Sequence, residues 1–248
     1  MTSVSLLLCA ATSRELASLA PHFSPPEDDG QKNPWPEMHL WPLRLKHGEA
    51  LCCITGVGPV NAALAMGHAL SRAEAEGRAV TAAINAGLAG AFDLATHSLR
   101  SLCLVREEIW PEYGLHDGTQ VSAGAFGFPL WQPEQGTAVR DRLFLAAPEE
   151  MKYPGIDCKQ GVFLSCTSLT VAGVSASFAR AAAMRIHFGA DLENMEGFAV
   201  AYACARQGVP CLEVRSVSNK VGPRARDEKD FPGAHSALAQ VLPALNLI

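Results

Sequence analysis

Short apolar runs bounded by turn residues alternate along this chain with longer segments of helical spacing. The short runs are typical of buried strands, and the longer segments are typical of amphipathic helices. This alternation predicts an α/β fold in which helices flank a buried sheet. The predicted strands are Val4–Cys9, Met38–Leu45, Ala50–Thr55, Thr81–Asn85, Leu102–Val105, Gly161–Cys166 and Pro210–Val217. The predicted helices are Ser13–Leu19, Val60–Glu76, Val174–Phe188, Met195–Gln207 and His235–Leu245.

Two stretches show neither the short apolar runs of strands nor the spacing of helices, and they are predicted to be irregular. Pro21–Pro36 is rich in Pro, Asp and Gly and is interpreted as a solvated surface loop. Trp110–Gly136 carries several aromatic residues, which either close over a ligand or anchor the loop to the core. No repeat or Gly/Ser linker divides the chain, so we expect one domain over residues 1–248.

Composition narrows the range of partners. The chain has 248 residues, of which 48% are hydrophobic and 18% charged, enough to close one large core. The net charge of −5 and the lack of a basic block argue against nucleic acid. No uninterrupted apolar run approaches the roughly 18 residues of a membrane span. We therefore expect a soluble protein whose partner is a small molecule, with neither nucleic acid nor a membrane.

The cysteines and histidines lack the spacing of a metal site. The eight cysteines lie mostly inside apolar runs without a C-x-x-C pair, and the eight histidines show no H-E-x-x-H. We therefore expect no metal and no cofactor. Buried free thiols are typical of a reducing compartment, which predicts a cytoplasmic protein.

Two glycine-containing segments follow predicted strands. Gly56–Asn61 contains a G-x-G at a helix start, but Asn61 replaces the third glycine of the dinucleotide fingerprint. Asn85–Phe92 is a run of small residues that can admit a flat ligand at the edge of a sheet. Either segment could instead be a tight turn that needs glycine for a positive φ.

Two polar segments supply candidate chemistry. Glu193 and Glu196 are spaced one helical turn apart at the predicted start of an apolar helix. Glu193 is interpreted as a charge that complements the helix dipole. The apolar surroundings of Glu196 favour a site carboxylate that accepts hydrogen bonds from sugar hydroxyls. Asn219 ends an apolar strand and is either a turn former or a ligand for one edge of a 6-oxopurine.

Four segments together resemble the nucleoside phosphorylase and nucleosidase family, which includes 5′-methylthioadenosine/S-adenosylhomocysteine nucleosidases. They are, in chain order, Gly56–Ala63, Asn85–Gly90, Glu193–Gly197 and Arg215–Asn219. The resemblance covers most of the chain. It implies a three-layer fold with a central mixed sheet, cleavage of the N-glycosidic bond of a purine nucleoside, and a homo-oligomer, dimeric or larger. Within the family, the chain is most similar to hydrolases that release hypoxanthine from a nucleoside carrying a benzoate.

The resemblance also implies roles for individual residues. Glu15 matches the family's water-activating glutamate, although without the family it would be interpreted as an exposed helix residue. Glu196 is implied to bind the ribose 2′- and 3′-hydroxyls, with Met195 packed beside the sugar. The aromatic residue that usually stacks on the base is not evident, and Phe92 or an aromatic residue of Trp110–Trp131 is the candidate replacement. The implied lining of the base pocket comprises Ala89, Gly90, Phe92, Thr167 and Leu169.

Asn219 stands where methylthioadenosine nucleosidases usually carry aspartate. A carboxylic acid can protonate N7 of adenine, whereas a neutral amide acts only by hydrogen bonding. The amide matches hypoxanthine, because its NH2 donates to O6 while its oxygen accepts from N7–H. A 6-aminopurine would place donor against donor at a cost of about 1–3 kcal/mol, which corresponds to tenfold to hundredfold discrimination.

Phosphorolysis and simple binding are the alternatives. A phosphorylase needs several Arg, Ser and glycine amides around a phosphate, and Arg14 is one candidate in a set that is otherwise not evident. Glu15 beside the attacking group would also repel phosphate, so hydrolysis is favoured. A nucleoside-binding protein without turnover is disfavoured because both Glu15 and Glu196 are retained. The sequence leaves open which Arg or Lys would bind the benzoate.

Overall fold

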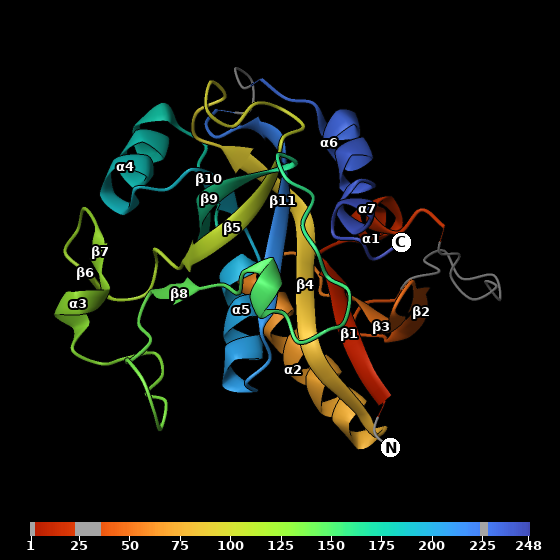
Figure 1. The fold of residues 1–248 in the computed structure, drawn as a ribbon. Coiled ribbons are helices and arrows are strands. Elements are labelled where there is room, and N and C mark those ends of the chain that lie inside the picture. The colour runs from red at the N-terminus through yellow and green to blue at the C-terminus, as the bar shows by residue number, and fades with distance from the viewer. Residues whose placement is uncertain (1–2, 23–35, 224–227) are drawn as a thin grey trace.

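The fold is built around a mixed β-sheet (Figure 1). The structure, a computed structural model, describes residues 3–22, 36–223 and 228–248. Its strands are β1 (Ser3–Ala10), β2 (Trp41–Leu45), β3 (Gly48–Ile54), β4 (Arg78–Ala91), β5 (Leu102–Ile109), β6 (Leu115–His116), β7 (Val121–Ser122), β8 (Arg142–Phe144), β9 (Phe163–Thr170), β10 (Leu192–Asn194) and β11 (Cys211–Lys220). Within the described ranges the main sheet has nine strands, in the order β10-β9-β5-β11-β4-β1-β3-β2 with β8 beside β5, while β6 pairs with β7.

Helices cover both faces of this sheet (Figure 1). They are α1 (Ser13–Leu19), α2 (Pro59–Ala75), α3 (Ala123–Phe126), α4 (Phe178–Phe188), α5 (Gly197–Arg206), α6 (Phe231–Leu238) and α7 (Val241–Ala244), with a short 3-10 helix at Pro148–Glu150. Alternate side chains of β1 explain the layers. Leu6 and Leu8 pack in the core shared by α1, α6 and α7, whereas Leu7 and Cys9 pack in the core shared by α2 and α5. The chain therefore has the predicted three-layer α/β architecture.

Five strands of the sheet close into a ring. β4 pairs with β11, β11 with β5, β5 with β9, β9 with β10, and the short β10 pairs back on β4. In this register Glu193 lies opposite Gly90 on one side and Leu169 on the other. Asn219 also lies beside Gly90, across a bulge in β11. The ring thus brings three distant segments of the chain to one place.

β4 is longer than predicted, and its length excludes a tight glycine turn at Asn85–Gly90. Asn85–Gly90 is part of a continuous strand that ends at Ala91, and it is not a glycine turn. Neither Gly87 nor Gly90 has a positive φ. A Cβ atom on Gly87 would lie 2.7 Å from Arg215 Nη1 and 2.9 Å from Glu15 Oε1. The small residues therefore make room for neighbouring side chains inside the sheet.

The segment around Glu193 also differs from the prediction. Glu193 lies on β10 and Glu196 immediately precedes α5, so the two are not successive turns of one helix. The prediction that Glu193 complements a helix dipole is therefore wrong. The Asn194 side-chain oxygen accepts from the backbone N–H groups of Glu196 (2.8 Å) and Gly197 (2.7 Å), and so it caps the start of α5.

The remaining differences concern the C-terminal helix and the loops. The predicted helix His235–Leu245 is divided into α6 and α7, because Pro243 has no N–H to continue the first helix. Most of Pro21–Pro36 lies outside the described residues. In Trp110–Gly136, Trp110 packs on Phe198 with ring centroids 5.9 Å apart. Within the described ranges, no helix is long and apolar enough to cross a membrane.

Candidate active site

A cavity of about 620 Å³ opens beside the ring of strands, between α1, the turn before α2, the end of β4, β10, the end of β11 and α6. Six of the nine residues predicted to form the site line it together, although they come from four separate segments of the chain. They are Glu15, Ala89, Gly90, Met195, Glu196 and Asn219. No residue of the 110–136 segment is part of the lining. In this structure the segment is anchored through its aromatic side chains and does not cover the cavity.

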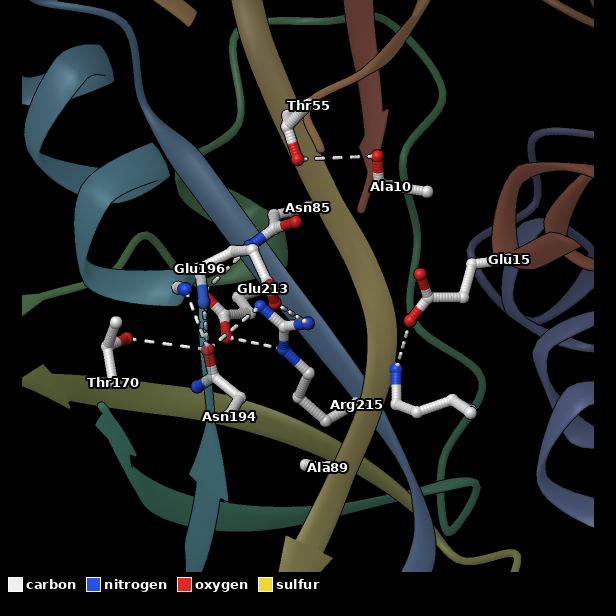
Figure 2. Close-up of polar contacts among 12 residues, drawn as sticks. Ala10, Glu15, Thr55, Asn85, Ala89, Thr170, Asn194, Glu196, Glu213 and Arg215 are labelled. Atoms are coloured by element: carbon white, nitrogen blue, oxygen red, sulfur yellow. Dashed lines mark hydrogen bonds and ion pairs between the residues drawn. The ribbon is translucent and has the colours of Figure 1, made fainter. Parts of the chain in front are cut away.

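Glu15 is held inward from the first turn of α1. Its Oε2 accepts from the Thr12 N–H (3.0 Å) and the Thr12 hydroxyl (2.8 Å), which forms a capping box, since the Thr12 hydroxyl also accepts from the Glu15 N–H. Its Oε1 accepts from the Leu88 N–H at 2.9 Å (Figure 2). The residue is only 7% exposed. These bonds fix a carboxylate at the wall of the cavity, so Glu15 is not an exposed helix residue.

Glu196 is held from the opposite side by the glycine turn before α2. The Gly58 N–H donates to Glu196 Oε1 at 2.9 Å, and Gly58 has a φ of +94°, which favours glycine. Arg215 Nη1 lies 3.8 Å from Glu196 Oε2. Burial raises the pKa of Glu196, and Arg215 and the Gly58 N–H partly oppose this shift. The turn is therefore a tight strand-to-helix connection that also orients a buried carboxylate.

Arg215 lies beneath Glu196 and pairs with carboxylates of a buried acidic cluster. Figure 2 shows its side chain directed toward Glu196, Glu213 and Asn194. Arg215 Nε donates to Glu213 Oε1 at 2.8 Å, and Nη2 donates to Asn194 Oδ1 at 3.4 Å. Burial opposes the charged form of Arg215, but the carboxylates of Glu213, Glu196 and Glu108 outweigh it and raise the guanidinium pKa. Burial and the neighbouring Glu213 raise the pKa of Glu108 well above its ordinary value.

A third buried carboxylate at the cavity, Glu193, was misjudged from the sequence. Glu193 accepts from the Ser175 N–H (2.8 Å) and the Ser175 hydroxyl (2.6 Å), and both residues line the cavity. Burial raises the pKa of Glu193, although the bonds from Ser175 lower it in part. The pair fixes the chain that leaves β9 against the wall of the cavity. Nothing in the local sequence marks Ser175, because its partner is 18 residues away.

Asn219 lies at the end of β11, as its position after an apolar run predicts. Its Oδ1 accepts from the Ser218 hydroxyl at 2.9 Å, and its Nδ2 donates to the Lys220 carbonyl at 2.9 Å. A Cβ atom on Gly90 would lie 3.0 Å from this Nδ2. Glycine on β4 therefore allows the amide to lie close to the strand and face the cavity.

Three predicted members of the base pocket lie elsewhere. Leu169 is fully buried in a hydrophobic cluster that also contains Phe92. Thr167 donates its N–H to Asp191 Oδ2 and does not line the cavity. The prediction ended the strand at Cys166, whereas β9 continues to Thr170. The segment that enters the cavity after this strand is consequently 174–176, which carries no aromatic residue.

Basic side chains occur along the lining as well. Arg14 is exposed, His235 lies on α6, and Lys229 lies beside Asn219 through a backbone bridge. His235 Nδ1 is 3.2 Å from the Ser18 hydroxyl, and burial and the charge of Arg14 lower its pKa. Among the described residues, no group of His, Cys, Asp and Glu is arranged to hold a metal ion.

Comparison with known proteins identifies the family. Residues 6–245 match the family model of the phosphorylase superfamily. The chain belongs to the phosphorylase superfamily. A superfamily relative, the futalosine hydrolase of Thermus thermophilus, is 35% identical over 192 residues, which cover 77% of this chain and 78% of that protein.

Other superfamily proteins are similar at lower identity. A 5′-methylthioadenosine/S-adenosylhomocysteine nucleosidase of Halalkalibacterium halodurans is 30% identical over 198 residues, with 78% of each chain covered. The solved structure of a nucleosidase of the same name from S. pneumoniae superposes with a TM-score of 0.69 at 20% identity, with 97% of each chain covered. The chain therefore shares both the sequence signature and the fold of this superfamily.

Proposed function

We propose that this protein hydrolyses the N-glycosidic bond of futalosine and releases hypoxanthine and dehypoxanthine futalosine, a step of the alternative menaquinone pathway. The observation that carries the proposal is that Glu15, Glu196 and Asn219, from three distant segments, line one cavity. The likeness to the futalosine hydrolase of T. thermophilus supports the choice of substrate. Glu193–Gly197 and Val217–Arg224 carry the same likeness in the sequence, although Arg224 lies outside the described residues.

In the proposed reaction, water attacks C1′ of the ribose while the bond from C1′ to N9 of the base breaks. Glu15 holds the water and takes its proton, and the leaving base gains a proton at N7 from solvent. Positive charge develops on the ribose as the bond lengthens, and the carboxylates of Glu15 and Glu196 stabilise it. Glu196 also accepts hydrogen bonds from the 2′- and 3′-hydroxyls, with Met195 packed beside the sugar.

Hydrolysis is favoured over phosphorolysis by the charges at the site. Glu15, Glu193 and Glu196 place three carboxylates along the cavity. Arg215, the buried guanidinium nearest to them, already pairs with Glu213 and Glu196. In the part of the chain that the structure describes, a phosphate dianion would therefore meet repulsion without a free buried cation to bind it.

Selection of the base is assigned to Asn219, with the backbone of Ala89 and Gly90 beside it. The amide oxygen has two lone pairs, one of which accepts from Ser218, so one remains for N7–H of hypoxanthine. The amide NH2 has a second hydrogen beyond its bond to Lys220, and this hydrogen donates to O6. The 30% identical methylthioadenosine nucleosidase makes adenine nucleosides the second candidate class, which Asn219 disfavours.

The deciding experiment supplies the purified protein with futalosine, aminofutalosine, inosine and methylthioadenosine, each with and without phosphate. Released bases are separated and identified by chromatography. We expect hypoxanthine from futalosine at a rate that phosphate does not change. A requirement for phosphate would replace hydrolysis by phosphorolysis, and faster release of adenine would overturn the role of Asn219. Binding of futalosine without release of any base would make the protein a binder.

We also propose a cytoplasmic homo-oligomer, dimeric or larger. All eight cysteines are free thiols and seven are buried, which fits a reducing compartment. Three exposed apolar residues form a stripe across the turn before α2 and the start of that helix: Val57, Val60 and Leu64. Val57 also lines the cavity. Such a stripe at the edge of a site is suited to cover by a second copy of the chain. Light scattering after size-exclusion chromatography tests this, and a monomeric mass would reject it.

A further inference from the structure

The cavity has an acidic floor and a basic rim, and the rim has no part in the proposed bond cleavage. Glu15 and Glu196 are each almost fully buried, whereas Arg14 is exposed at the same opening. Glu15 is turned inward by its bonds to Thr12 and Leu88. Its neighbour Arg14 is therefore left on the solvent side, one residue away from the carboxylate that faces the reaction.

Arg14 differs from the other basic groups at the site. Among the described residues, no carboxylate lies within ion-pair distance of its guanidinium. Arg215, by contrast, is committed to Glu213 and Glu196. His235 contacts Ser18, and burial and the charge of Arg14 lower its pKa, which favours the neutral ring.

α6 connects the part of the cavity near Asn219 with α1. α6 follows directly on the chain that bridges to Asn219, and Phe231 in its first turn lines the cavity. His235 lies one turn further along and reaches Ser18 of α1, beside which α6 packs (Figure 1). The cavity lining therefore continues from the amide assigned to the base along α6 to α1, the helix that carries Arg14.

In the proposed binding mode, with the base at Asn219 and the ribose at Glu196, the 5′ substituent extends along this lining toward α1. In futalosine this substituent ends in a benzoate. A guanidinium can bind a carboxylate through two parallel hydrogen bonds, which a lysine ammonium cannot do. We propose that Arg14 binds the carboxylate of the 5′ substituent and so selects futalosine over nucleosides without an anionic group. This inference rests on the proposed function.

The test measures kcat/KM for futalosine and for its methyl ester, in wild type and in Arg14→Met. The ester removes the charge from the substrate, and the substitution removes it from the protein while keeping an unbranched side chain. We expect wild type to prefer the acid by about tenfold to a hundredfold, the range for a hydrogen bond between charged groups. In Arg14→Met this preference should fall to about threefold or less, and Arg14→Lys should retain part of it.

Arg72→Met is the matched control, because Arg72 is an exposed arginine on α2 that pairs with Glu76 and does not line the cavity. It should keep the wild-type preference for the acid. An unchanged preference in Arg14→Met, or its loss in Lys229→Met alone, would overturn the proposal. A phosphate-dependent rate that disappears in Arg14→Met would show that Arg14 binds phosphate instead. If wild type releases no base from futalosine, the proposed function itself is wrong, a result distinct from all of these.

Discussion

Replacing Glu15 by glutamine tests the proposed mechanism at a single atom. A carboxylate offers about four lone-pair positions, and three of them at Glu15 already accept from Thr12 N–H, the Thr12 hydroxyl and Leu88 N–H. About one position therefore remains to hold and deprotonate water. Glutamine can keep the bonds to Thr12 through its oxygen, but its NH2 group then faces the Leu88 N–H. The substitution removes the base and leaves the partly buried Leu88 N–H without its acceptor.

Two effects of different size follow from this geometry. Loss of a general base lowers kcat by about 10²–10⁴-fold. The unpaired Leu88 N–H lowers the free energy of unfolding by about 1–3 kcal/mol, which the folded protein can tolerate. We expect Glu15→Gln to bind futalosine with a Kd within a few-fold of wild type and to release hypoxanthine at least a hundredfold more slowly. Calorimetry measures the first quantity, and chromatography of the released base measures the second.

The matched control is Glu76→Gln, which alters an exposed carboxylate that pairs with Arg72 on α2. It should leave both kcat and Kd unchanged. The assignment of Glu15 as the base would be refuted by a Glu15→Gln variant that is folded, as judged by its urea unfolding transition, and retains more than about a tenth of the wild-type kcat.

Three further predictions concern the base and the buried cluster. Asn219→Asp supplies an acid for N7 of adenine, so the rate with methylthioadenosine relative to inosine should rise about tenfold to a hundredfold, and an unchanged ratio would reject this role. Gly90→Ala places a Cβ atom 2.9 Å from Val221 Cγ2 and 3.0 Å from Asn219 Nδ2, which should displace the amide and raise KM for futalosine. An unaltered KM would mean that the close contact between Gly90 and Asn219 does not position the amide. Burial and the neighbouring Glu213 raise the pKa of Glu108, so the folded protein favours the protonated form of this side chain. The free energy of unfolding should therefore fall as the pH rises from about 4.5 through the raised pKa. Glu108→Gln should make this decline shallower in urea unfolding between about pH 5 and about pH 9, and an identical pH slope would contradict it.

Local sequence patterns were sufficient to predict those features that depend on residues close together in the chain. α1 was predicted at its observed bounds from its helical spacing, and the capping box between Thr12 and Glu15 explains why the helix begins there. The cores on the two faces of the sheet follow from the alternation of Leu6, Leu7 and Leu8 in β1. Glu196 was expected to be a site carboxylate because a carboxylate in an apolar setting requires partners, and it lines the cavity.

Long-range pairing accounts for what the sequence did not reveal. β9 continues through Ser168 and Thr170, polar residues that normally signal the end of a buried strand. Both are fully buried because they bond to Asn194 inside the ring of strands, and Thr170 also bonds to Glu108. Such partners are distant in the chain, so no periodicity discloses them, and the base pocket was predicted too early along the strand.

The excess of buried carboxylates over cations has a consequence for inhibitors. Glu196 and Glu213 share the single guanidinium of Arg215, and Glu15 adds another carboxylate at the wall of the cavity. Holding these groups close together is costly until a positive charge enters the site. A sugar mimic with a protonated ring nitrogen at the anomeric position would bring that charge permanently, whereas the substrate acquires it only fleetingly. Such a compound should therefore bind far more tightly than a neutral nucleoside of the same shape.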